Sequence, residues 1–541
     1  MRFQLQPYSS TPIARRILAL REGAFSDSPH LKALSESFLL DRANSFASSK
    51  RETLVDVLRD QYKTQGLTEA QAHHLSSLLL PKAVTMTCGH QLILGGGPLF
   101  VHSKIREVSV ASTQWTRPER PVVPIFWMAT EDHDVEEVRH ILFNGKRYSM
   151  PNAFEGRAVG TIPAKAVHPV LERIERDWGH HEAVTKQLKV LKSAYIEGET
   201  LADATRRMMA HWHPDVLCLD PMDSRLKAIA KDLWKDEVQS QSVFENQNNS
   251  PWAKCGWEPP VLAKPSSLFY LHQGRRTRLH FSGDEKWDLG GERMIQEDLL
   301  KHIERNPESI SPNALLRPVY QEYILPNVLY AGGAGEMEYW LQLIPYFKKK
   351  NLPQVRMHLR SSFEWWPEKA WYNWQKLTSH GVSYYDTISE VRSKWLKEAS
   401  APIKGSYPLT ELLEEKVRDV YGKFKDLDRS IASWIKRFAN EEDRIRERAR
   451  RSVLRTQSER WKAFLSVKST QFPGSIESGG EGKMQERVWT VLDLAYHFGA
   501  PSFETYSEAL LKHLNLHKDL TFQWVWLLPH ADKKTVDKPG N

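Results

Sequence analysis

The spacing of apolar residues divides the chain into helical and strand-like stretches. From Leu31 to Leu80 apolar side chains recur every three or four residues, as at Leu54, Leu58 and Tyr62, and this period predicts helices. A short strand is expected over Ala83 to Thr87, where a glycine-bearing turn follows the apolar residues.

Further strands are expected downstream. Val122 to Met128 is a continuous apolar run, typical of a strand buried on both faces of a sheet. Asn327 to Ala331 leads through glycines into a helix from Glu336, and Gln354 to His358 is the next strand. Strands separated by crossover segments favour a mostly parallel sheet and an α/β fold, in which ligands bind beyond the carboxyl ends of the strands.

Near the C-terminus the apolar residues follow a heptad pattern, with alternating steps of four and three residues. The positions are Leu413, Val417, Val420, Phe424, Leu427, Ile431, Trp434 and Phe438. A second, arginine-dense helical stretch follows Asn440, so a long helical hairpin is predicted. Acidic residues such as Glu441 and Glu442 dilute its positive field, which favours a solvated or dimer-facing helix over a nucleic-acid site.

Composition excludes several classes of protein. The chain has 541 residues and 40% apolar content, enough for two or three domains. Its three cysteines are widely spaced and form neither a disulfide framework nor paired zinc ligands, which favours a reducing, cytoplasmic compartment. Arginines interrupt the N-terminal apolar stretches, and no apolar run approaches the roughly 20 residues that span a bilayer. The net charge of +8 is spread over interspersed charges of both signs, so neither membrane nor nucleic acid is expected as a partner.

The first candidate site motif is the turn Cys88-Gly89-His90-Gln91. A glycine turn that leads into a helix presents N–H groups and the positive end of a dipole, which suit a phosphate or carboxylate. His90 and Gln91 can donate hydrogen bonds to such an anion, and Gly95 to Gly97 would let the chain pass close to a ligand. On these residues alone, a buried structural histidine explains His90 equally well, and Cys88 is better explained as a small packed residue than as a nucleophile.

The second motif, Glu131-Asp132-His133-Asp134, crowds ionisable groups directly after the most apolar strand. Three roles stay open for it: a general base toward an amine, ligation of Mg²⁺, or an ion-pair hub with nearby arginines and Lys104. Zinc is less favoured, because His133 and His140 lie seven residues apart and no cysteine is near in sequence.

A third motif, Gly332-Gly333-Ala334-Gly335-Glu336, opens the predicted helix. Its amides could cradle a phosphate while Glu336 binds a hydroxyl or an amine. The basic run Arg275-Arg276-Thr277-Arg278 is interpreted mainly as the solvated tip of a hairpin. The sequence contains no Walker A loop, dinucleotide GxGxxG fingerprint or GxSxG elbow.

Taken in order, several sequence blocks carry a resemblance to one family. The blocks are Thr87 to Gln91 with Gly97-Pro98-Leu99 and Lys104, Pro124 to Trp127 with Glu131 to Asp134, Ser311-Pro312-Asn313, Leu316-Arg317-Pro318, Tyr320-Gln321-Glu322, Ile324 to Asn327, Gly332-Gly333, Gly335-Glu336, Tyr339-Trp340, Leu359 to Ser362 and Gln485-Glu486-Arg487. Together they resemble the cysteine ligases that add cysteine in bacillithiol biosynthesis. Many of those proteins have Thr-Gly-Gln-Gln where this chain has Cys88-Gly89-His90-Gln91.

The resemblance implies an α/β fold with a Rossmann-like, nucleotidyltransferase-type core, connecting insert domains and a C-terminal helical coiled coil that forms a homodimer. The expected segments are 1–134 for the first part of the core, 135–310 for the insert with further core elements, 311–385 for the second part of the core, 386–475 for the coiled-coil hairpin and 476–541 for a C-terminal segment packed on the core.

The implied activity is the last step of bacillithiol biosynthesis, in which the carboxyl group of cysteine forms an amide with the amine of glucosaminyl-malate. Activation by ATP is expected, with ATP or ADP as the bound nucleotide and Mg²⁺ as a further candidate. Two rival interpretations are a nucleotidyltransferase-like enzyme that activates another small acid and a non-catalytic coiled-coil scaffold.

The candidate residues divide by role. The residues expected to stabilise phosphate charge are Gly89, His90, Gln91, Gly332, Gly333 and Gly335. Asp132, His133 or Glu336 is expected to deprotonate the amine, and these three form the catalytic set with His90. Lys104, Arg317 and Arg360 are expected to bind the malate carboxylates, and Asp134 to make a further substrate contact.

Overall fold

The computed structural model describes residues 2–6, 28, 30, 32–254, 256, 258–395, 409–474, 482–499 and 524–528. The chain divides into two compact units, which are described separately. The first comprises Phe3–Glu364 and Glu486–Leu527, and the second is mainly Trp365–Gln485. Within the described residues, no helix combines the length and the apolar character needed to cross a membrane. Cys255 lies outside the described residues, as does most of the expected segment 476–541.

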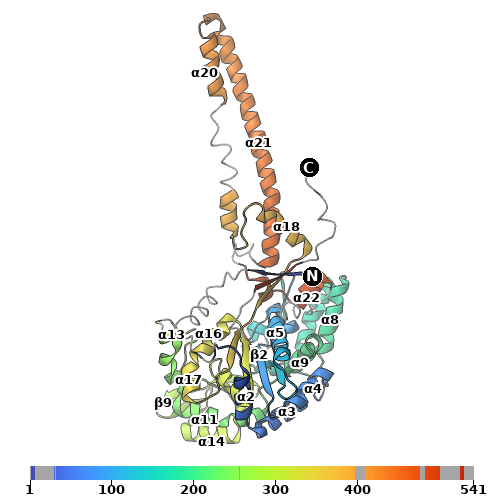
Figure 1. Cartoon of the computed structure of the whole chain (residues 1–541), viewed down its shortest axis with the longest axis vertical. Helices are drawn as coiled ribbons and strands as arrows, with labels where there is room; N and C mark the ends of the chain where they lie inside the picture. Colours follow the sequence, from blue (N-terminus) through green and yellow to red (C-terminus); the bar gives the residue numbers. More distant parts are fainter. Residues whose placement is uncertain are drawn as a thin grey trace. The chain divides into compact units, whose positions relative to one another are not determined.

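A five-stranded, all-parallel sheet forms the centre of the first unit (Figure 1) and confirms the α/β prediction. Its strand order is β14-β13-β2-β3-β6. The strands are β2 (Val84–His90), β3 (Val122–Met128), β6 (Leu217–Leu219), β13 (Asn327–Gly332) and β14 (Arg356–Leu359). The four strands expected from the sequence all lie in this sheet, whereas β6 was not expected.

Helices pack against the strands of this sheet. Helix α5 (Leu99–Trp115) packs along β2 and β3, and α16 (Ala334–Gln342) packs against β13 and β14. The helical period over Leu31 to Leu80 is confirmed by α2 (Glu36–Ser45), α3 (Ser48–Gln61) and α4 (Glu69–Ser77). The other helices of this unit, 3₁₀ turns aside, are α6 (Val135–Val138), α7 (His168–Trp178), α8 (Glu182–Ala194), α9 (Leu201–Trp212), α10 (Ser224–Ile229), α11 (Lys231–Ser240), α12 (Ser242–Glu245), α13 (Pro251–Lys254), α14 (Gln296–Arg305), α15 (Arg317–Ile324), α17 (Ile344–Lys349) and α22 (Val491–Phe498).

Small antiparallel sheets fill the region between β3 and β13. The strands are β4 (His140–Phe143) with β5 (Lys146–Ser149); β7 (Leu268–His272) with β8 (Arg275–Arg278) and β12 (Ile310–Pro312); and β9 (His280–Gly283), β10 (Lys286–Asp288) and β11 (Arg293–Ile295). A further sheet has the order β1 (Arg2–Gln6), β16 (Trp524–Leu528), β15 (Ser362–Trp365). The five-segment division of the chain stays a prediction.

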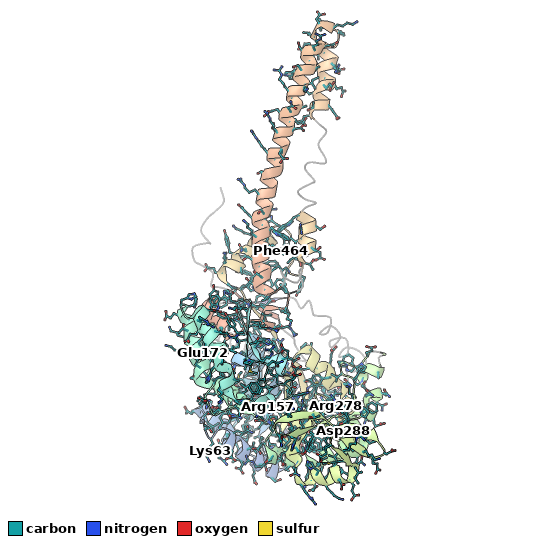
Figure 2. All side chains as sticks on the ribbon, turned by 180° about the vertical axis from the view of Figure 1, so that it is seen from behind. Lys63, Arg157, Glu172, Arg278, Asp288 and Phe464 are labelled. Atoms are coloured by element: carbon teal, nitrogen blue, oxygen red, sulfur yellow. The ribbon has the colours of Figure 1, made fainter. Side chains whose placement is uncertain are left out.

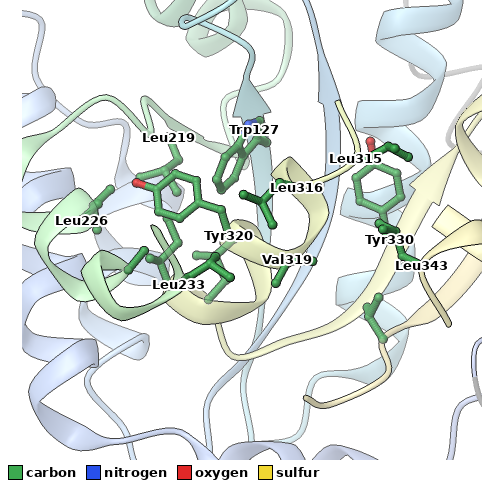
Figure 3. Packing of buried hydrophobic residues seen from close by; sticks show 14 of the residues in the cluster. Trp127, Leu219, Leu226, Leu233, Leu315, Leu316, Val319, Tyr320, Tyr330 and Leu343 are labelled. Atoms are coloured by element: carbon green, nitrogen blue, oxygen red, sulfur yellow. The ribbon is translucent and has the colours of Figure 1, made fainter. Parts of the chain in front are cut away.

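Aromatic side chains close the core below the carboxyl ends of the strands (Figure 3). Tyr320 of α15 meets Trp127 of β3 edge to face, with ring centroids 5.6 Å apart, and its hydroxyl donates a hydrogen bond to the carbonyl of Pro221 at 2.7 Å. Leu219 and Leu226 pack beside them in the same buried cluster (Figure 3). This packing fixes α15, and therefore Arg317 at its first turn, against the end of β3.

Glu237 of α11 makes the stability of the first unit dependent on pH. Burial raises the pKa of Glu237 to about 7, well above that of an exposed glutamate. Because protonation is easier in the folded than in the unfolded chain, the stabilisation is complete below the unfolded pKa and is lost as pH rises through 7. The free energy of unfolding in urea is measured for Glu237→Gln and for the native chain. As the pH rises from 4 to 8, the variant should become more stable than the native chain by about 3 kcal/mol. A pH-independent difference would contradict this, and Asp232→Asn, an exposed change on the same helix, is the control.

The second unit contains the expected helical hairpin, but its turn lies elsewhere. Helix α18 (Glu368–Thr378) is followed by α20 (Leu409–Tyr421) and by α21 (Asp428–Gln471), which is 44 residues long. The heptad pattern had predicted one helix through Phe438 and a turn near Asn440. Instead α20 ends at Tyr421, just before Gly422, and α21 runs through Asn440 without a break. Heptad spacing thus continues across the turn and occupies both arms of the hairpin.

Candidate functional site

A cavity of about 680 Å³ opens at the carboxyl ends of β2, β3 and β13 within the first unit. This is the size of cavity that binds small molecules, and its place is the one expected for ligands of a parallel sheet. Ten of the predicted residues line it: Gly89, His90, Gln91, Lys104, Asp132, Arg317, Gly333, Gly335, Glu336 and Arg360. His133, Asp134 and Gly332 are not among the lining residues.

An ion pair between Lys104 and Glu336 lines the cavity. Lys104 is 2% exposed, pairs with the Glu336 carboxylate, and donates a hydrogen bond to the carbonyl of Gly89 at 3.1 Å. Glu336 also accepts hydrogen bonds from the Gly333 amide at 2.8 Å and the Tyr330 hydroxyl at 2.9 Å. Burial by itself would raise the pKa of Glu336, but Lys104 and the Gly333 amide outweigh it and lower the pKa to about 2. Glu336 is therefore ionised and fully engaged.

His90 lies beside this pair as a neutral imidazole. Burial, with Lys104 nearby, lowers the pKa of His90 to about 4. Its Nδ1 lies 3.2 Å from the carbonyl oxygen of Gln91, which can only accept, so the proton is assigned to Nδ1 and Nε2 keeps its lone pair. The ring meets Phe100 edge to face at 5.0 Å.

The acidic loop acts largely as an ion-pair hub, although with other partners than the sequence suggested. Glu131 pairs with the fully buried Lys227 of α10, not with Lys104, whose partner is Glu336. Burial raises the pKa of Glu131 and lowers that of Lys227. Glu131 is thus committed to Lys227, which does not suit a magnesium ligand.

Asp132 is the loop carboxylate that stays accessible from the cavity. Its Oδ2 accepts a hydrogen bond from Gln91 Nε2 at 2.6 Å, and its Oδ1 accepts one from the His133 amide at 2.8 Å. Arg276 Nη1 lies 3.7 Å from Oδ1. These contacts fix the carboxylate in one orientation while its side chain stays about a quarter exposed.

His133 and Asp134 have structural roles in this geometry. Arg276 Nη1 lies 3.1 Å from His133 Nδ1; because the guanidinium only donates, Nδ1 is an acceptor and the proton is assigned to Nε2. Burial, followed by Arg276, lowers the pKa of His133. Asp134 is exposed and caps α6, where its side chain accepts a hydrogen bond from the Glu137 amide at 3.3 Å.

The two glycine motifs differ in what they do. At β13 the predicted turn from strand to helix is confirmed, because the strand ends at Gly332 and α16 opens at Ala334, while phosphate binding there stays a prediction. A Cβ on Gly335 would meet nothing within 4 Å, and Gly335 lines the cavity. At β2 the prediction is wrong: Gly89 is inside the strand, and the helix opens only at Leu99, whose amide donates to the Trp489 carbonyl.

Gly95 to Gly97 do not approach the cavity. All three have positive φ, and a Cβ on Gly96 would come within 2.6 Å of the Trp212 ring. A Cβ on Gly95 would press on Ile141 at 3.1 Å. These glycines serve close packing between the turn and its neighbours, not close approach to a ligand.

Arg360 is held rigidly at the rim of the α16 opening. Its guanidinium donates to both carboxylate oxygens of Glu486, at 2.9 and 3.1 Å, and is 5% exposed. Its Nε is buried and has no hydrogen-bond acceptor among the described residues. A Cβ on Gly333 would lie 3.9 Å from that Nε, which places this free N–H beside the N-terminus of α16.

Other lining residues were missed or misjudged from the sequence. Arg276 and Arg278, interpreted as a solvated hairpin tip, do belong to a hairpin strand, but both line the cavity and Arg276 is 8% exposed. Strand alternation in Arg275-Arg276-Thr277-Arg278 was the signal for this, since every second side chain points the same way. Further missed lining residues include Tyr330, Tyr339, Lys264 and Arg487. Of these four, only Arg487 and Tyr339 lie in blocks that the sequence had singled out.

Cys88 is fully buried in β2 and does not line the cavity. Burial raises the pKa of its thiol, which removes it as a nucleophile and confirms its interpretation as a packed residue. Among the residues that the structure describes, no group of three or more His, Cys, Asp or Glu side chains has an arrangement suited to a metal ion.

The parallel sheet and the cavity at its carboxyl edge define an α/β protein with a ligand site of the Rossmann type. The chain belongs to the family described as "Bacillithiol biosynthesis BshC, N-terminal Rossmann-like domain", whose model matches residues 22–361. The resemblance seen in the sequence and the Rossmann-like core are thereby confirmed. The nucleotidyltransferase-type relationship and the coiled coil stay predictions.

Curated relatives carry the name "Putative cysteine ligase BshC". The protein of Flavobacterium johnsoniae is 26% identical over 453 residues, covering 81% of this chain and 85% of its own. That of Flavobacterium psychrophilum is 28% identical and covers 86% and 87%. The Cytophaga hutchinsonii protein is 33% identical over 319 residues, covering 56% and 58%.

Proposed function

We propose that this chain is a ligase that joins the carboxyl group of cysteine to the amine of glucosaminyl-malate, the last step of bacillithiol biosynthesis. The names of its relatives support the reaction class. The observation that carries the proposal is one cavity in which an accessible carboxylate, Asp132, faces the same space as the amides of a helix N-terminus and several cations. Amide formation from an acid and an amine needs both parts.

Activation of the carboxylate by ATP is the first step of the proposed reaction. A carboxylate oxygen of cysteine attacks phosphorus, forms a C–O–P bond and displaces ADP or pyrophosphate. The opening of α16 suits the phosphoryl group, because the Ala334 and Gly335 amides belong to its first turn and the free Nε–H of Arg360 lies beside that turn. Arg317 and Arg487 add positive charge to the same wall. Mg²⁺ enters only as the usual companion of nucleotide phosphates.

The amine of the acceptor then attacks the activated carbonyl carbon. The new C–N bond forms, the C–O bond to phosphate or AMP breaks, and one proton leaves the amine. Asp132 is the proposed base, because it is ionisable, accessible and oriented by Gln91. The other candidates are less suited: Glu336 is held at a pKa of about 2, His90 at about 4, and His133 does not line the cavity.

The direct assay combines purified full-length chain with cysteine, glucosaminyl-malate and ATP, and follows the thiol product by mass spectrometry. We expect a product whose mass is the sum of the two substrates less one water. Absence of this product under every nucleotide and redox condition would reject the ligase. Nucleotide consumption with a different carboxylic acid in place of cysteine would instead favour an enzyme that activates another small acid.

We also propose that the hairpin of α20 and α21 pairs with a second copy of the chain. Large apolar side chains stay exposed along it, including Val420 at 60%, Phe424 at 56% and Trp434 at 42%. These side chains belong to the heptad pattern, whose repeat suits helix pairing. A solvated hairpin would not need them.

For the hairpin, sedimentation of the native chain should give a dimer, and Val420→Glu should shift it to monomer. Glu415→Lys, on the polar side of the same helix, should leave the dimer intact. A monomeric native chain would contradict the pairing, as would equal sensitivity to both changes.

A further inference from the structure

The cations that line the cavity fall into two groups according to whether they already have a carboxylate partner. Lys104 is neutralised by Glu336 and Arg360 by Glu486. Arg276 shares Asp132 at 3.7 Å. Among the residues that the structure describes, Lys264, Arg278, Arg317 and Arg487 have no carboxylate within ion-pair distance. Arg317 and Arg487 belong to the wall already assigned to the phosphoryl group, which leaves Lys264 and Arg278. Two cations without counter-charge in a cavity wall indicate an anionic ligand.

Arg278 is positioned by its surroundings and not left to move freely. Its guanidinium lies over the Phe269 ring at 4.7 Å, and Nη1 donates a hydrogen bond to the Ser266 carbonyl at 3.3 Å. Arg276 stacks on the same ring at 4.0 Å. One aromatic side chain of β7 thus orders two guanidinium groups of β8, which reduces the entropy lost when they bind a ligand.

The hairpin that carries these arginines is itself anchored. The Arg276 amide donates to the Gly156 carbonyl at 3.0 Å, and the Ala158 amide donates to the Gly274 carbonyl at 2.9 Å. Figure 2 labels Arg157, of that neighbouring segment, and Arg278. Arg276 further donates to the Ser311 hydroxyl at 3.0 Å and to the Pro312 carbonyl at 2.6 Å. The cationic wall therefore sits on supported backbone, as a binding site requires.

We propose that Arg278 and Lys264, with Arg276 behind them, form the subsite for the two carboxylates of the acceptor, and so determine acceptor specificity. The inference rests on the proposed function and reassigns the dicarboxylate away from Lys104 and Arg360, whose charges are already matched, and from Arg317, which is assigned to the phosphoryl group. Arg276 touches both His133 and Asp132. An acceptor held by its carboxylates at this wall would extend its amine toward the Asp132 carboxylate, its proposed base.

The test compares Arg278→Gln with Arg275→Gln in the full-length chain. Both residues lie on β8 and both changes remove one charge, but Arg275 is exposed and does not line the cavity. Calorimetric binding of glucosaminyl-malate should weaken about ten- to hundredfold in Arg278→Gln, the usual effect of losing a charged hydrogen bond. It should change less than twofold in Arg275→Gln, and Arg278→Lys should recover part of the loss. The KM for cysteine should stay unchanged in all three.

A second ligand separates the subsite from the overall charge. The native chain should prefer glucosaminyl-malate over methyl glucosaminide, which lacks the carboxylates, and Arg278→Gln should lose most of that preference. Equal effects of the two glutamine variants, or an unchanged preference, would overturn the subsite while the ligase activity stands. If the native chain neither binds glucosaminyl-malate nor forms product from it, the proposed function itself fails. Equal thermal midpoints of the variants check that folding is intact.

Discussion

Replacing Asp132 with asparagine is expected to lower kcat for amide formation by about a thousandfold, the usual contribution of a positioned general base. Asparagine has nearly the same shape and can still accept a hydrogen bond from Gln91 or the His133 amide, but it cannot accept the amine proton. The loss should therefore appear in kcat, with little change in the KM for cysteine or in thermal stability. Steady-state kinetics with mass detection of the product measures it.

Asp134→Asn is the matched control for this change. Asp134 lies two residues further along the same loop, is exposed, and caps α6, a position where asparagine serves equally well. Its kcat should stay within threefold of the native value. A native-like kcat for Asp132→Asn would remove Asp132 from the chemistry.

Replacing Lys104 with methionine is expected to destabilise the chain by about 2–3 kcal/mol and to reduce ligation at least tenfold. The change leaves Glu336 charged and largely buried without its cation, and breaking one side of such a pair is costly. The cost lies below the usual range of about 3–5 kcal/mol because Glu336 is 24% exposed. Urea unfolding and the ligation assay measure the two effects.

The double variant Lys104→Met with Glu336→Gln separates stability from activity. Removing both charges should restore most of the unfolding free energy, since no unpaired charge remains. Activity should stay low, because the pair also orients the opening of α16 through the Gly333 amide. Arg106→Met, on the same helix, breaks a pair with Asp215 outside the cavity and should leave activity nearly unchanged. Full activity in the double variant would show that the pair serves folding alone.

The fold could be predicted where the burial of an element in the structure also dictates the spacing of apolar residues in its sequence. The run from Val122 to Met128 became β3 at those residues, because a strand buried on both faces must be apolar throughout. Strand β6 was missed because Leu217–Leu219 is too short to show a period. The hairpin turn was misplaced because the apolar spacing of α20 and α21 happens to continue through Gly422, where the helix nevertheless ends.

The sequence predicts which loops form the candidate site, but not which charged residues pair with one another there. Three of the motifs end strands of one parallel sheet, so topology alone brought His90, Asp132 and Glu336 to one edge. The ion-pair partners come from segments that are distant in the sequence: Lys227 pairs with Glu131, and Glu486 pairs with Arg360. The role of Arg278 depends on which face of a hairpin strand meets the cavity, and that is fixed only by tertiary packing.

The transfer of oxygen from cysteine to the nucleotide tests the central claim, an amide ligase that activates a carboxylate, most directly. Cysteine labelled with ¹⁸O in its carboxyl group is supplied with glucosaminyl-malate and ATP, and the released phosphate and AMP are analysed by mass spectrometry. The proposed reaction predicts one ¹⁸O atom in phosphate or in AMP for each amide formed. Amide formation with unlabelled phosphate and AMP would contradict it.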